Sequence, residues 1–313
     1  MKLKKPKFWD YKHNSILSYL LWPLSKIVEK VSNSNKKNRK KITGIKSICV
    51  GNIYIGGTGK TSLAIEIKKI LEKLNIKSCF VKKYYPNQVD ELKILKEYGK
   101  VFVNKSRILA LNEAKKDGYK IAIFDDGLQD KDLTYDLNFV CFNKKKEIGN
   151  GLIIPAGPLR ENLNIIKNCD SIFLNGNNEK NLEFRNKLFE INQNITIYDT
   201  KYTINNINKF DLKKNYLVFS GIGNHETFIA MLKNNNFNIS KEIEYPDHYN
   251  YSDQDLNYLN LISKKNNLEI ITTKKDFLRM GLNNTNYKFV DVNLNISSYE
   301  NLKEKLYKFN ENN

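Results

Sequence analysis

Short apolar runs alternate with amphipathic segments along most of the chain, which is the pattern of helices packed against a sheet. The first apolar run covers residues 45–50, and a helix is predicted at about residues 60–74. Further strands are predicted at residues 78–83, 100–104, 120–126, 138–143 and 171–175. Because helical segments separate these runs, the pattern predicts a doubly wound α/β domain.

A second α/β unit is predicted after a stretch rich in Asn, Lys and Ile at residues 177–214. Its predicted elements are a strand at 216–220, helices near 226–234 and 252–265, and strands at 268–272 and 287–292. We therefore expect two domains, residues 1–190 and a smaller C-terminal α/β domain at residues 191–313. A chain of 313 residues with 41% hydrophobic content is long enough to bury two such cores.

The N-terminal region contains a stripe of large apolar side chains, as in an amphipathic helix. The members of the stripe recur at steps of three and four residues: Leu17, Leu20, Leu21, Leu24, Val28 and Val31. Tyr19 and Trp22 lie among them, and Pro23 predicts a kink or a late helix start. Flanking lysines make this composition typical of a helix in a membrane interface. The alternative is a stripe that packs on the protein's own core.

Positive charge is concentrated in the same region. The chain has a formal charge of +18, and residues 1–46 contain thirteen Lys and Arg against only Asp10 and Glu29. This charge predicts an anionic partner, either a membrane surface or a nucleic acid, and the neighbouring apolar stripe favours the membrane. The apolar run is too short to span a bilayer and no signal-peptide cleavage site follows it, so we expect the chain to stay in the cytoplasm.

The four cysteines are predicted to be reduced core residues. Cys49, Cys79, Cys141 and Cys169 are solitary, and three of them lie in or beside apolar runs. Such spacing does not suggest a disulfide framework or a metal site.

A phosphate-binding loop follows the first predicted strand, in the sequence GNIYIGGTGKT at residues 51–61. Its glycines, Gly56, Gly57 and Gly59, allow backbone N–H groups to approach phosphates closely, together with Thr58. Lys60 places a cation on the β and γ oxygens, and Thr61 offers a hydroxyl to Mg²⁺. The consensus pattern has glycine where this chain has Tyr54. The motif nevertheless predicts a nucleoside triphosphate site on a P-loop NTPase-type domain.

Two carboxylates end the predicted strand at residues 120–126. Asp125 and Asp126 follow an apolar run about 65 residues after the phosphate-binding loop, as expected of a Walker B element. Carboxylates at this strand end can hold Mg²⁺ directly or through water.

The order of these and later motifs resembles the tetraacyldisaccharide 4′-kinase family, the lipid A 4′-kinases. The resemblance covers nearly the whole chain, and the family tolerates a residue other than glycine at Tyr54. The motifs that carry it are VGN at 50–52, GGTGKT at 56–61, DDGLQ at 125–129, GNG at 149–151, PAGPLRE at 155–161, FSGIGN at 219–224, PDH at 246–248 and TTKKD at 272–276.

The resemblance implies an enzyme that uses Mg-ATP to phosphorylate the 4′-hydroxyl of a tetraacylated glucosamine disaccharide 1-phosphate, giving lipid IVA. It implies a P-loop kinase domain, a smaller C-terminal domain that closes the active-site cleft, and peripheral attachment to the cytoplasmic face of the inner membrane. The expected partners are the lipid disaccharide and the anionic membrane surface. We expect neither a nucleic-acid partner nor an obligate protein partner.

The resemblance also implies roles for individual residues. Asp90, in a segment where only Asp90 and Glu91 match the family's Gly-Asp-Glu-Pro, corresponds to the catalytic base, and His248 to the histidine that supports it. A carboxylate near the sugar hydroxyl, tuned by an imidazole, is sufficient for this chemistry. Arg160 is suited to hold phosphate through its guanidinium group. Glu161 is a candidate for the outer shell of the metal.

The chain departs from the family at two places linked to the acceptor lipid. Residues 82–85 read KKYY where the family has Ser-Arg-Gly-Tyr, and Asp130 replaces the histidine after Asp-Asp-Gly-Leu-Gln. These departures concern substrate recognition and rate, whereas the ATP side is intact.

Two other classes of protein share some of these features. A membrane-cycling P-loop ATPase switch also carries Gly-Gly-x-Gly-Lys-Thr, but it has a signature lysine where this chain has Ile55. A nucleic-acid-binding protein would share the charge, but the chain has no base-stacking motif.

Overall fold

The computed structural model describes residues 5–34, 39–176, 181–281 and 286–311, which form two compact units. The larger unit comprises residues 3–84, 95–201 and 296–313. The smaller unit comprises residues 85–94 and 202–295. The predicted boundary between residues 190 and 191 lies at the end of α5, whereas the chain enters the smaller unit after residue 201.

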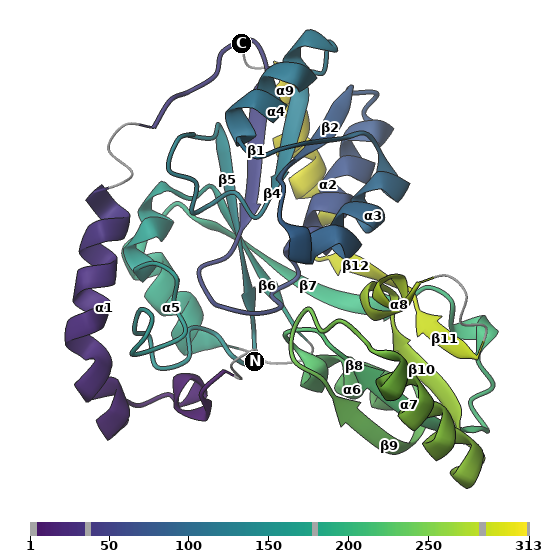
Figure 1. Ribbon diagram of the computed structural model, residues 1–313. Coiled ribbons are helices and arrows are strands. Elements are labelled where there is room, and N and C mark those ends of the chain that lie inside the picture. Colours follow the sequence, from purple (N-terminus) through teal and green to yellow (C-terminus); the bar gives the residue numbers. More distant parts are fainter. Residues whose placement is uncertain (1–4, 35–38, 177–180, 282–285, 312–313) are drawn as a thin grey trace. The chain divides into compact units, whose positions relative to one another are not determined.

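An eight-stranded sheet organises the larger unit (Figure 1), and the pairs from β7 to β3 for which register is defined are all parallel. In spatial order its strands are β12 (Val292–Ile296), β7 (Thr196–Ile204), β6 (Ser171–Asn175), β5 (Leu137–Asn143), β1 (Lys46–Gly51), β4 (Ile121–Asp125), β2 (Ser78–Lys83) and β3 (Val101–Asn104). The central strands are fully buried, which explains their continuous apolar runs.

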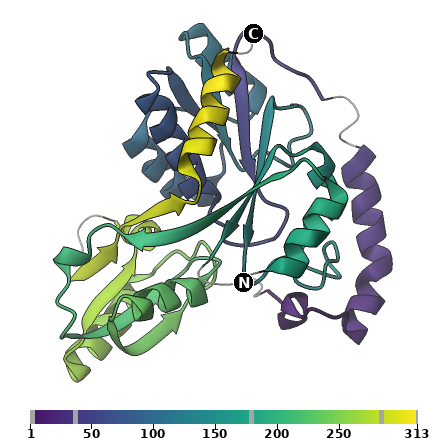
Figure 2. The same cartoon turned by 180° about the vertical axis from the view of Figure 1, so that it is seen from behind.

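Helices cover both faces of this sheet. On one face α2 (Lys60–Lys73) packs on β1, β2 and β4, and α9 (Tyr299–Glu311), seen in front in Figure 2, packs against α2. On the other face α4 (Arg107–Lys116) and α5 (Leu182–Ile191) contribute to two apolar clusters that include Cys49 and Phe124. The predicted doubly wound α/β class is confirmed.

The smaller unit has its own parallel four-stranded sheet with helices on both faces. Its strands in spatial order are β11 (Tyr287–Val290), β10 (Glu269–Thr273), β8 (Asn215–Ser220) and β9 (Asn238–Glu244). The helix α6 (His225–Asn234) packs on one face and α7 (Asp253–Asn266) on the other, while α8 (Lys274–Met280) follows β10 directly. The helix α3 (Val89–Tyr98) contributes its first six residues to this unit.

Most predicted elements are confirmed within one or two residues, but three are corrected. The Asn-rich stretch at residues 177–214 contains α5 and β7. The strand β9 was not predicted, because five of its seven residues are exposed and polar. The run at residues 287–292 is split between β11 and β12, which belong to different sheets.

The N-terminal helix α1 (Ile16–Ser34) turns its apolar stripe outward. It runs through Pro23, so the helix does not start late. The inward side carries Ser18 and Ser25, both at most 3% exposed, and Ser25 Oγ donates to the carbonyl oxygen of Ile153 at 2.7 Å. The exposed large apolar residues of α1 are Ile16, Leu17, Tyr19, Leu20, Trp22, Leu24, Ile27, Val28 and Val31. The alternative of a stripe packed on the protein's own core is therefore wrong.

All four cysteines are buried and reduced, as predicted. Burial raises the pKa of the Cys141 and Cys169 thiols to about 12, so these side chains behave as small apolar core residues.

Candidate active site

The phosphate-binding loop joins β1 to α2 in a conformation that depends on glycine. Gly56 and Gly59 have φ angles of +121° and +94°. Gly59 has no side chain that could cap the first N–H groups of α2, so these groups remain for an anion. The Asn52 amide donates to the carbonyl oxygen of Tyr54 at 2.6 Å, and its Oδ1 accepts from Lys60 Nζ at 3.1 Å. The loop and its lysine are thus held in place by one side chain.

Tyr54, at the position of the missing consensus glycine, packs against the N-terminal segment. Its side chain is 4% exposed, and its hydroxyl donates to Asp10 and accepts from Lys5 Nζ at 2.8 Å. Burial alone would raise the pKa of Asp10, but the hydrogen bonds from Lys5 and Tyr54 outweigh it and lower that pKa. A large side chain is accommodated here because it faces residues 5–10.

Asp125, at the end of β4, lies beside Thr61 as the sequence predicts for a magnesium site. Its Oδ2 accepts from Thr61 Oγ1 at 3.2 Å and from Lys82 Nζ at 2.8 Å. Asp125 Oδ1 is buried and accepts no hydrogen bond within the described part of the chain. The hydroxyl and the carboxylate oxygens together form a set of hard oxygen donors.

Asp126 is held by cations in a backbone conformation uncommon for residues other than glycine, with φ at +63°. Its Oδ1 lies 3.7 Å from Lys60 Nζ and accepts from Arg160 at 3.0 Å. Burial alone would raise the pKa of Asp126, but the charges of Lys60, Arg160 and Lys82 outweigh it and lower the pKa to about 2. Asp126 is therefore ionised at neutral pH.

Arg160 is brought to the phosphate-binding loop by backbone pairing. The Arg160 N–H donates to the carbonyl oxygen of Ile53 at 2.6 Å, and the Ile55 N–H donates to the carbonyl oxygen of Pro158 at 2.9 Å. The Gln129 side chain links Arg160 to the loop, because it accepts a hydrogen bond from Arg160 at 3.1 Å and donates one to the carbonyl oxygen of Asn52 at 2.8 Å. The guanidinium group that was predicted to bind phosphate therefore contacts Asp126, which also lies beside Lys60.

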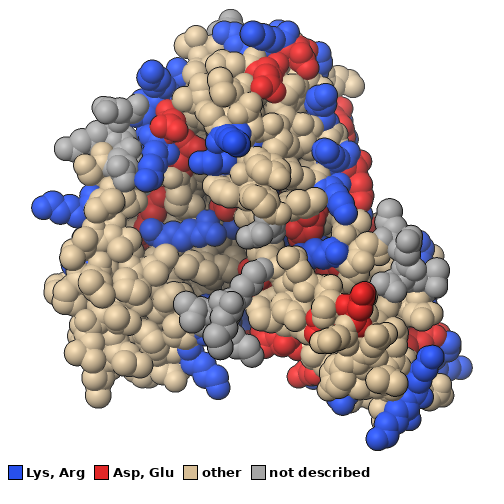
Figure 3. Space-filling model, in the orientation of Figure 1, with Lys and Arg blue, Asp and Glu red and all other residues tan. Residues whose placement is uncertain are grey.

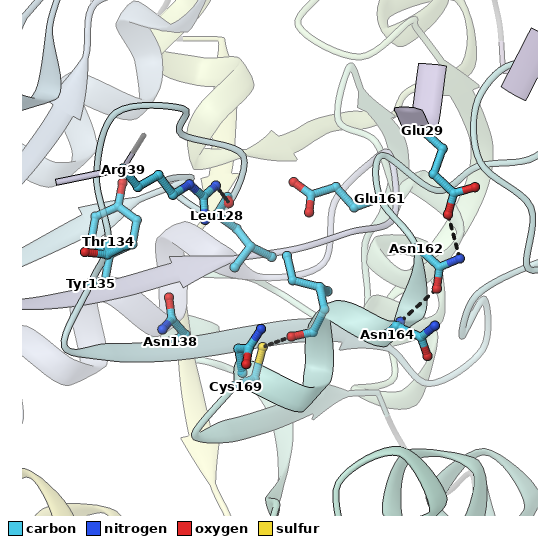
Figure 4. A pocket seen from close by; sticks show the side chains of 12 residues that line it. Glu29, Arg39, Leu128, Thr134, Tyr135, Asn138, Glu161, Asn162, Asn164 and Cys169 are labelled. Atoms are coloured by element: carbon cyan, nitrogen blue, oxygen red, sulfur yellow. Dashed lines mark hydrogen bonds between the residues drawn. The ribbon is translucent and has the colours of Figure 1, made fainter. Parts of the chain in front are cut away.

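Glu161 lines a cavity of about 540 Å³ in the larger unit. In Figure 4 its carboxylate points into this cavity, toward Arg39 and Leu128, with Cys169 in the opposite wall. The structure thus places Glu161 in the cavity wall, whereas Thr61 and Asp125 lie in direct contact. Its predicted role in the outer shell of a metal remains a prediction.

The two departures from the family motifs are both occupied by buried charged residues. Lys82 is 1% exposed and pairs with Asp125, so it supplies a fixed cation at the end of β4. Asp130 accepts from Arg107 at 2.7 Å and from the backbone of Asp132 at 2.8 Å. Asp130 therefore organises the turn after Gln129.

Asp90 and His248 lie together in the smaller unit. Asp90, in the first turn of α3, is 3% exposed, and its Oδ1 is 3.9 Å from His248 Nδ1. His248 has a φ of +55°, and its N–H donates to the carbonyl oxygen of Gly221 at 3.0 Å. The structure thus joins two residues that are 158 positions apart in the sequence.

Sequence reasoning missed two cations that contact the predicted carboxylates. Lys82 was seen only as a departure from the family pattern, and Arg279 was not singled out. Arg279 donates to Asp90 Oδ2 from Nε at 3.0 Å and from Nη2 at 2.8 Å. Its position three residues after Asp276 in the TTKKD motif was the only available signal.

The fold and the phosphate-binding loop together define a P-loop protein of the doubly wound α/β class. The sequence matches the family model for tetraacyldisaccharide-1-P 4′-kinase over residues 17–311. It is 54% identical to the tetraacyldisaccharide 4′-kinase of Pelagibacter ubique (strain HTCC1062) over all of both chains. It is 35% identical to that of Rickettsia bellii (strain OSU 85-389), covering 98% of this chain and 99% of the relative. The chain belongs to the tetraacyldisaccharide 4′-kinase family.

A solved structure supports the fold. LpxK from Aquifex aeolicus, described as an "apo" form in complex with ATP, superposes with a TM-score of 0.70 at 22% identity. The match covers 94% of this chain and 99% of that one. The family predicted from the order of motifs is confirmed, and with it the class of enzyme, a kinase.

Proposed function

We propose that this protein transfers the γ-phosphoryl group of ATP to the 4′-hydroxyl of a tetraacylated glucosamine disaccharide 1-phosphate in lipid A biosynthesis, giving lipid IVA. The observation that carries the proposal is a full-length match to tetraacyldisaccharide 4′-kinases in a chain whose phosphate-binding loop is complete in geometry. Relatives that carry this name match over their whole length, so the activity is assigned to the whole chain.

The larger unit supplies the groups that bind the nucleotide. The backbone N–H groups from Gly56 to Lys60 and the N-terminus of α2 face the phosphates, and Lys60 neutralises the β and γ oxygens. Arg160 adds a second cation for the charge that spreads over the transferred group. Asp126 orients both cations, since it lies within 3.7 Å of Lys60 and accepts from Arg160.

The larger unit also has donors that fit Mg²⁺. Thr61 and Asp125 would hold the ion, and the buried Asp125 Oδ1 has no hydrogen-bond donor among the described residues. In the described ranges, no three His, Cys, Asp or Glu side chains form a metal-binding cluster. A hydroxyl and one carboxylate suit an ion that takes its other ligands from phosphate and water. When bound, Mg²⁺ neutralises phosphate charge as the phosphoryl group departs.

The smaller unit supplies the base. Asp90 accepts the proton of the 4′-hydroxyl as the oxygen attacks the γ-phosphorus, and His248 lies beside Asp90 Oδ1 to stabilise the carboxyl group after proton transfer. The bond between the γ-phosphorus and the bridging oxygen breaks, and ADP departs with that oxygen. The 4′-oxygen forms the new bond to the phosphorus.

A labelling experiment tests the proposal and separates it from the alternative of a membrane-cycling ATPase switch. The protein is incubated with γ-labelled ATP, Mg²⁺ and the detergent-dispersed disaccharide 1-phosphate, with a 4′-deoxy disaccharide as the matched control. We expect label in the lipid only when the 4′-hydroxyl is present. Release of labelled phosphate without labelled lipid would instead favour the ATPase switch.

The proposal includes attachment to an anionic membrane surface through α1. The apolar residues of α1 are exposed while its serines face the protein, and Lys12 and Lys26 are 76% and 54% exposed at their side chains. Figure 3 shows the surface over α1, at the left, as largely free of charge, with basic side chains toward its upper end. A helix with such a face and basic flanks binds at the level of anionic headgroups.

We expect the protein to attach to the membrane surface as a peripheral protein. None of the helices formed by the described residues is long and apolar enough to cross a membrane. We assign the protein to the cytoplasmic face of the inner membrane, where ATP is available. Its substrate is a lipid that the interface holds.

Leu20→Glu is predicted to weaken binding to vesicles containing anionic lipid by about tenfold or more, because it removes an exposed leucine that would enter the membrane and adds a negative charge. Leu261→Glu in α7 is the matched control, since the two leucines are 69% and 67% exposed. Co-sedimentation at low and high salt measures the binding. Kinetics with a water-soluble acceptor should be unchanged in both variants. Equal sedimentation of Leu20→Glu and wild type would contradict the membrane assignment.

A further inference from the structure

The smaller unit contains a buried guanidinium group that contacts the proposed base directly. We infer that Arg279, itself fixed by Asp276, is a positioning residue that holds the Asp90 carboxylate in the orientation needed to accept a proton. The inference rests on the proposed role of Asp90. It assigns a purpose to the end of the TTKKD motif, which the proposed function leaves unused.

The two carboxylate oxygens of Asp90 have different partners. Both Nε and Nη2 of Arg279 donate to Asp90 Oδ2, at 3.0 and 2.8 Å. Asp90 Oδ1 lies on the side of His248, 3.9 Å from its Nδ1. Because two N–H groups donate to one oxygen, the carboxylate cannot rotate without losing both hydrogen bonds. Oδ1 is therefore the oxygen presented for proton transfer.

The other end of the guanidinium group is anchored to the interior of the unit. Arg279 Nη1 donates to Asp276 Oδ1 at 2.7 Å and to the carbonyl oxygen of Gly221 at 2.7 Å. Asp276 is fully buried and also accepts from the Gly221 N–H at 3.0 Å and from the Tyr251 hydroxyl at 2.9 Å. The rigid end of β8 and the start of α8 therefore hold Arg279 in place.

The same scaffold positions His248. Gly221 accepts from both the His248 N–H and Arg279, so the two groups that flank Asp90 share one backbone anchor. A side chain at Gly221 would meet the Tyr251 hydroxyl at 2.9 Å and the Tyr249 Cβ at 3.0 Å, which shows how closely the 246–251 segment packs there. Arg279, Asp90 and His248 are thus placed by one connected network.

The charge of Arg279 is secure. Burial alone would lower the pKa of Arg279, but the carboxylates of Asp276 and Asp90 outweigh it and raise that pKa. The groups that face Asp90 from the neighbouring elements are Arg279 in α8 and His248, with Asp247 3.9 Å from His248 Nε2. A permanent cation beside Asp90 strengthens both hydrogen bonds that hold its Oδ2.

A nearby ion pair also joins α3 and α8, and it provides the matched control. Lys275 Nζ pairs with Glu91 at 2.8 Å, so it joins the same two helices through a carboxylate other than that of Asp90. If Arg279 only joined helices, replacing it and replacing Lys275 would have the same kind of effect. If it positions the base, only its replacement lowers turnover while leaving the KM for ATP unchanged.

The test compares Arg279→Gln, Arg279→Lys and Lys275→Gln in the full-length protein. For Arg279→Gln we expect turnover to fall by about tenfold to a hundredfold with the KM for ATP within about twofold of wild type. Arg279→Lys keeps the charge but loses the planar pair of N–H donors, so its turnover should also fall, with the KM for ATP again near the wild-type value. Lys275→Gln should change neither turnover nor the KM for ATP.

The outcomes separate the inference from the proposed function. Wild-type turnover in Arg279→Gln, or an equal loss of turnover in Lys275→Gln, with inactive Asp90→Asn, would overturn the positioning role and leave Asp90 as the base. An active Asp90→Asn protein would overturn both. A melting curve will show whether Arg279→Gln folds. If it does not fold, Arg279→Lys is the deciding variant, because it keeps the charge but loses the pair of hydrogen bonds to Asp90 Oδ2. Wild-type turnover in Arg279→Lys would overturn the inference.

Discussion

Replacing Lys60 with alanine should reduce turnover by about a hundredfold or more, equivalent to ~3 kcal/mol of transition-state stabilisation. Lys60 Nζ is held at the phosphate-binding loop by Asn52 and lies beside Asp126, where we propose that its charge acts on the β and γ phosphates. Thr61→Ala should have a comparable effect, since it removes the hydroxyl that lies 3.2 Å from Asp125 and is placed to hold Mg²⁺. Transfer of label from γ-labelled ATP to the lipid measures both losses.

Lys69→Ala is a suitable control for the lysine replacement. Lys69 lies in the same helix and pairs with Glu66 at 2.8 Å, away from the phosphate-binding loop. It should retain nearly full activity, because a partly exposed ion pair at the side of the helix contributes little to stability. Unchanged turnover in a folded Lys60→Ala protein would contradict the assignment of the phosphate-binding loop.

Asp90→Asn should lower turnover by about a hundredfold or more while leaving the affinity for ATP nearly unaltered. The amide cannot accept the proton of the acceptor hydroxyl, yet it has the size and shape of the carboxylate. His248→Ala should act in the same direction but less strongly, since the imidazole supports the base from 3.9 Å. Steady-state kinetics and equilibrium binding of an ATP analogue separate the two effects.

Glu91→Gln provides the control for the base. It changes the neighbouring carboxylate of α3, which pairs with Lys275, and it should leave turnover within a few-fold of wild type. Loss of ATP binding in Asp90→Asn, with an intact chemical step, would show that the segment at residues 89–92 was matched to the family wrongly.

The phosphate-binding loop could be predicted from sequence because its conformation is local. Gly56 and Gly59 adopt positive φ angles that a short stretch of sequence specifies by itself, and α2 begins at Lys60 where the motif places it. The strands of the larger sheet were also predictable, since a parallel sheet covered on both faces requires continuous apolar runs. The elements that were missed, β7 and β9, contain many polar residues and are only partly buried.

The helix α1 shows where pattern alone is insufficient. The apolar stripe was visible in the sequence, but an apolar stripe is equally suited to a protein core and to a membrane interface. The structure decided the orientation, because Ser18 and Ser25 make hydrogen bonds to Asn150, Ile153 and Ala156 and thereby turn the stripe outward.

By itself the sequence determined the nucleotide-binding loop, the strand order along the chain and, through the order of its motifs, the family. Only the tertiary structure decided which charges meet, as with Arg279 and Asp90, which are 189 residues apart, and Lys82 and Asp125, which are 43 apart. Local motifs are specified by backbone preferences within a few residues of each other. Pairs between distant segments depend on strand register and helix packing, and a difference of one residue in either would direct these side chains elsewhere.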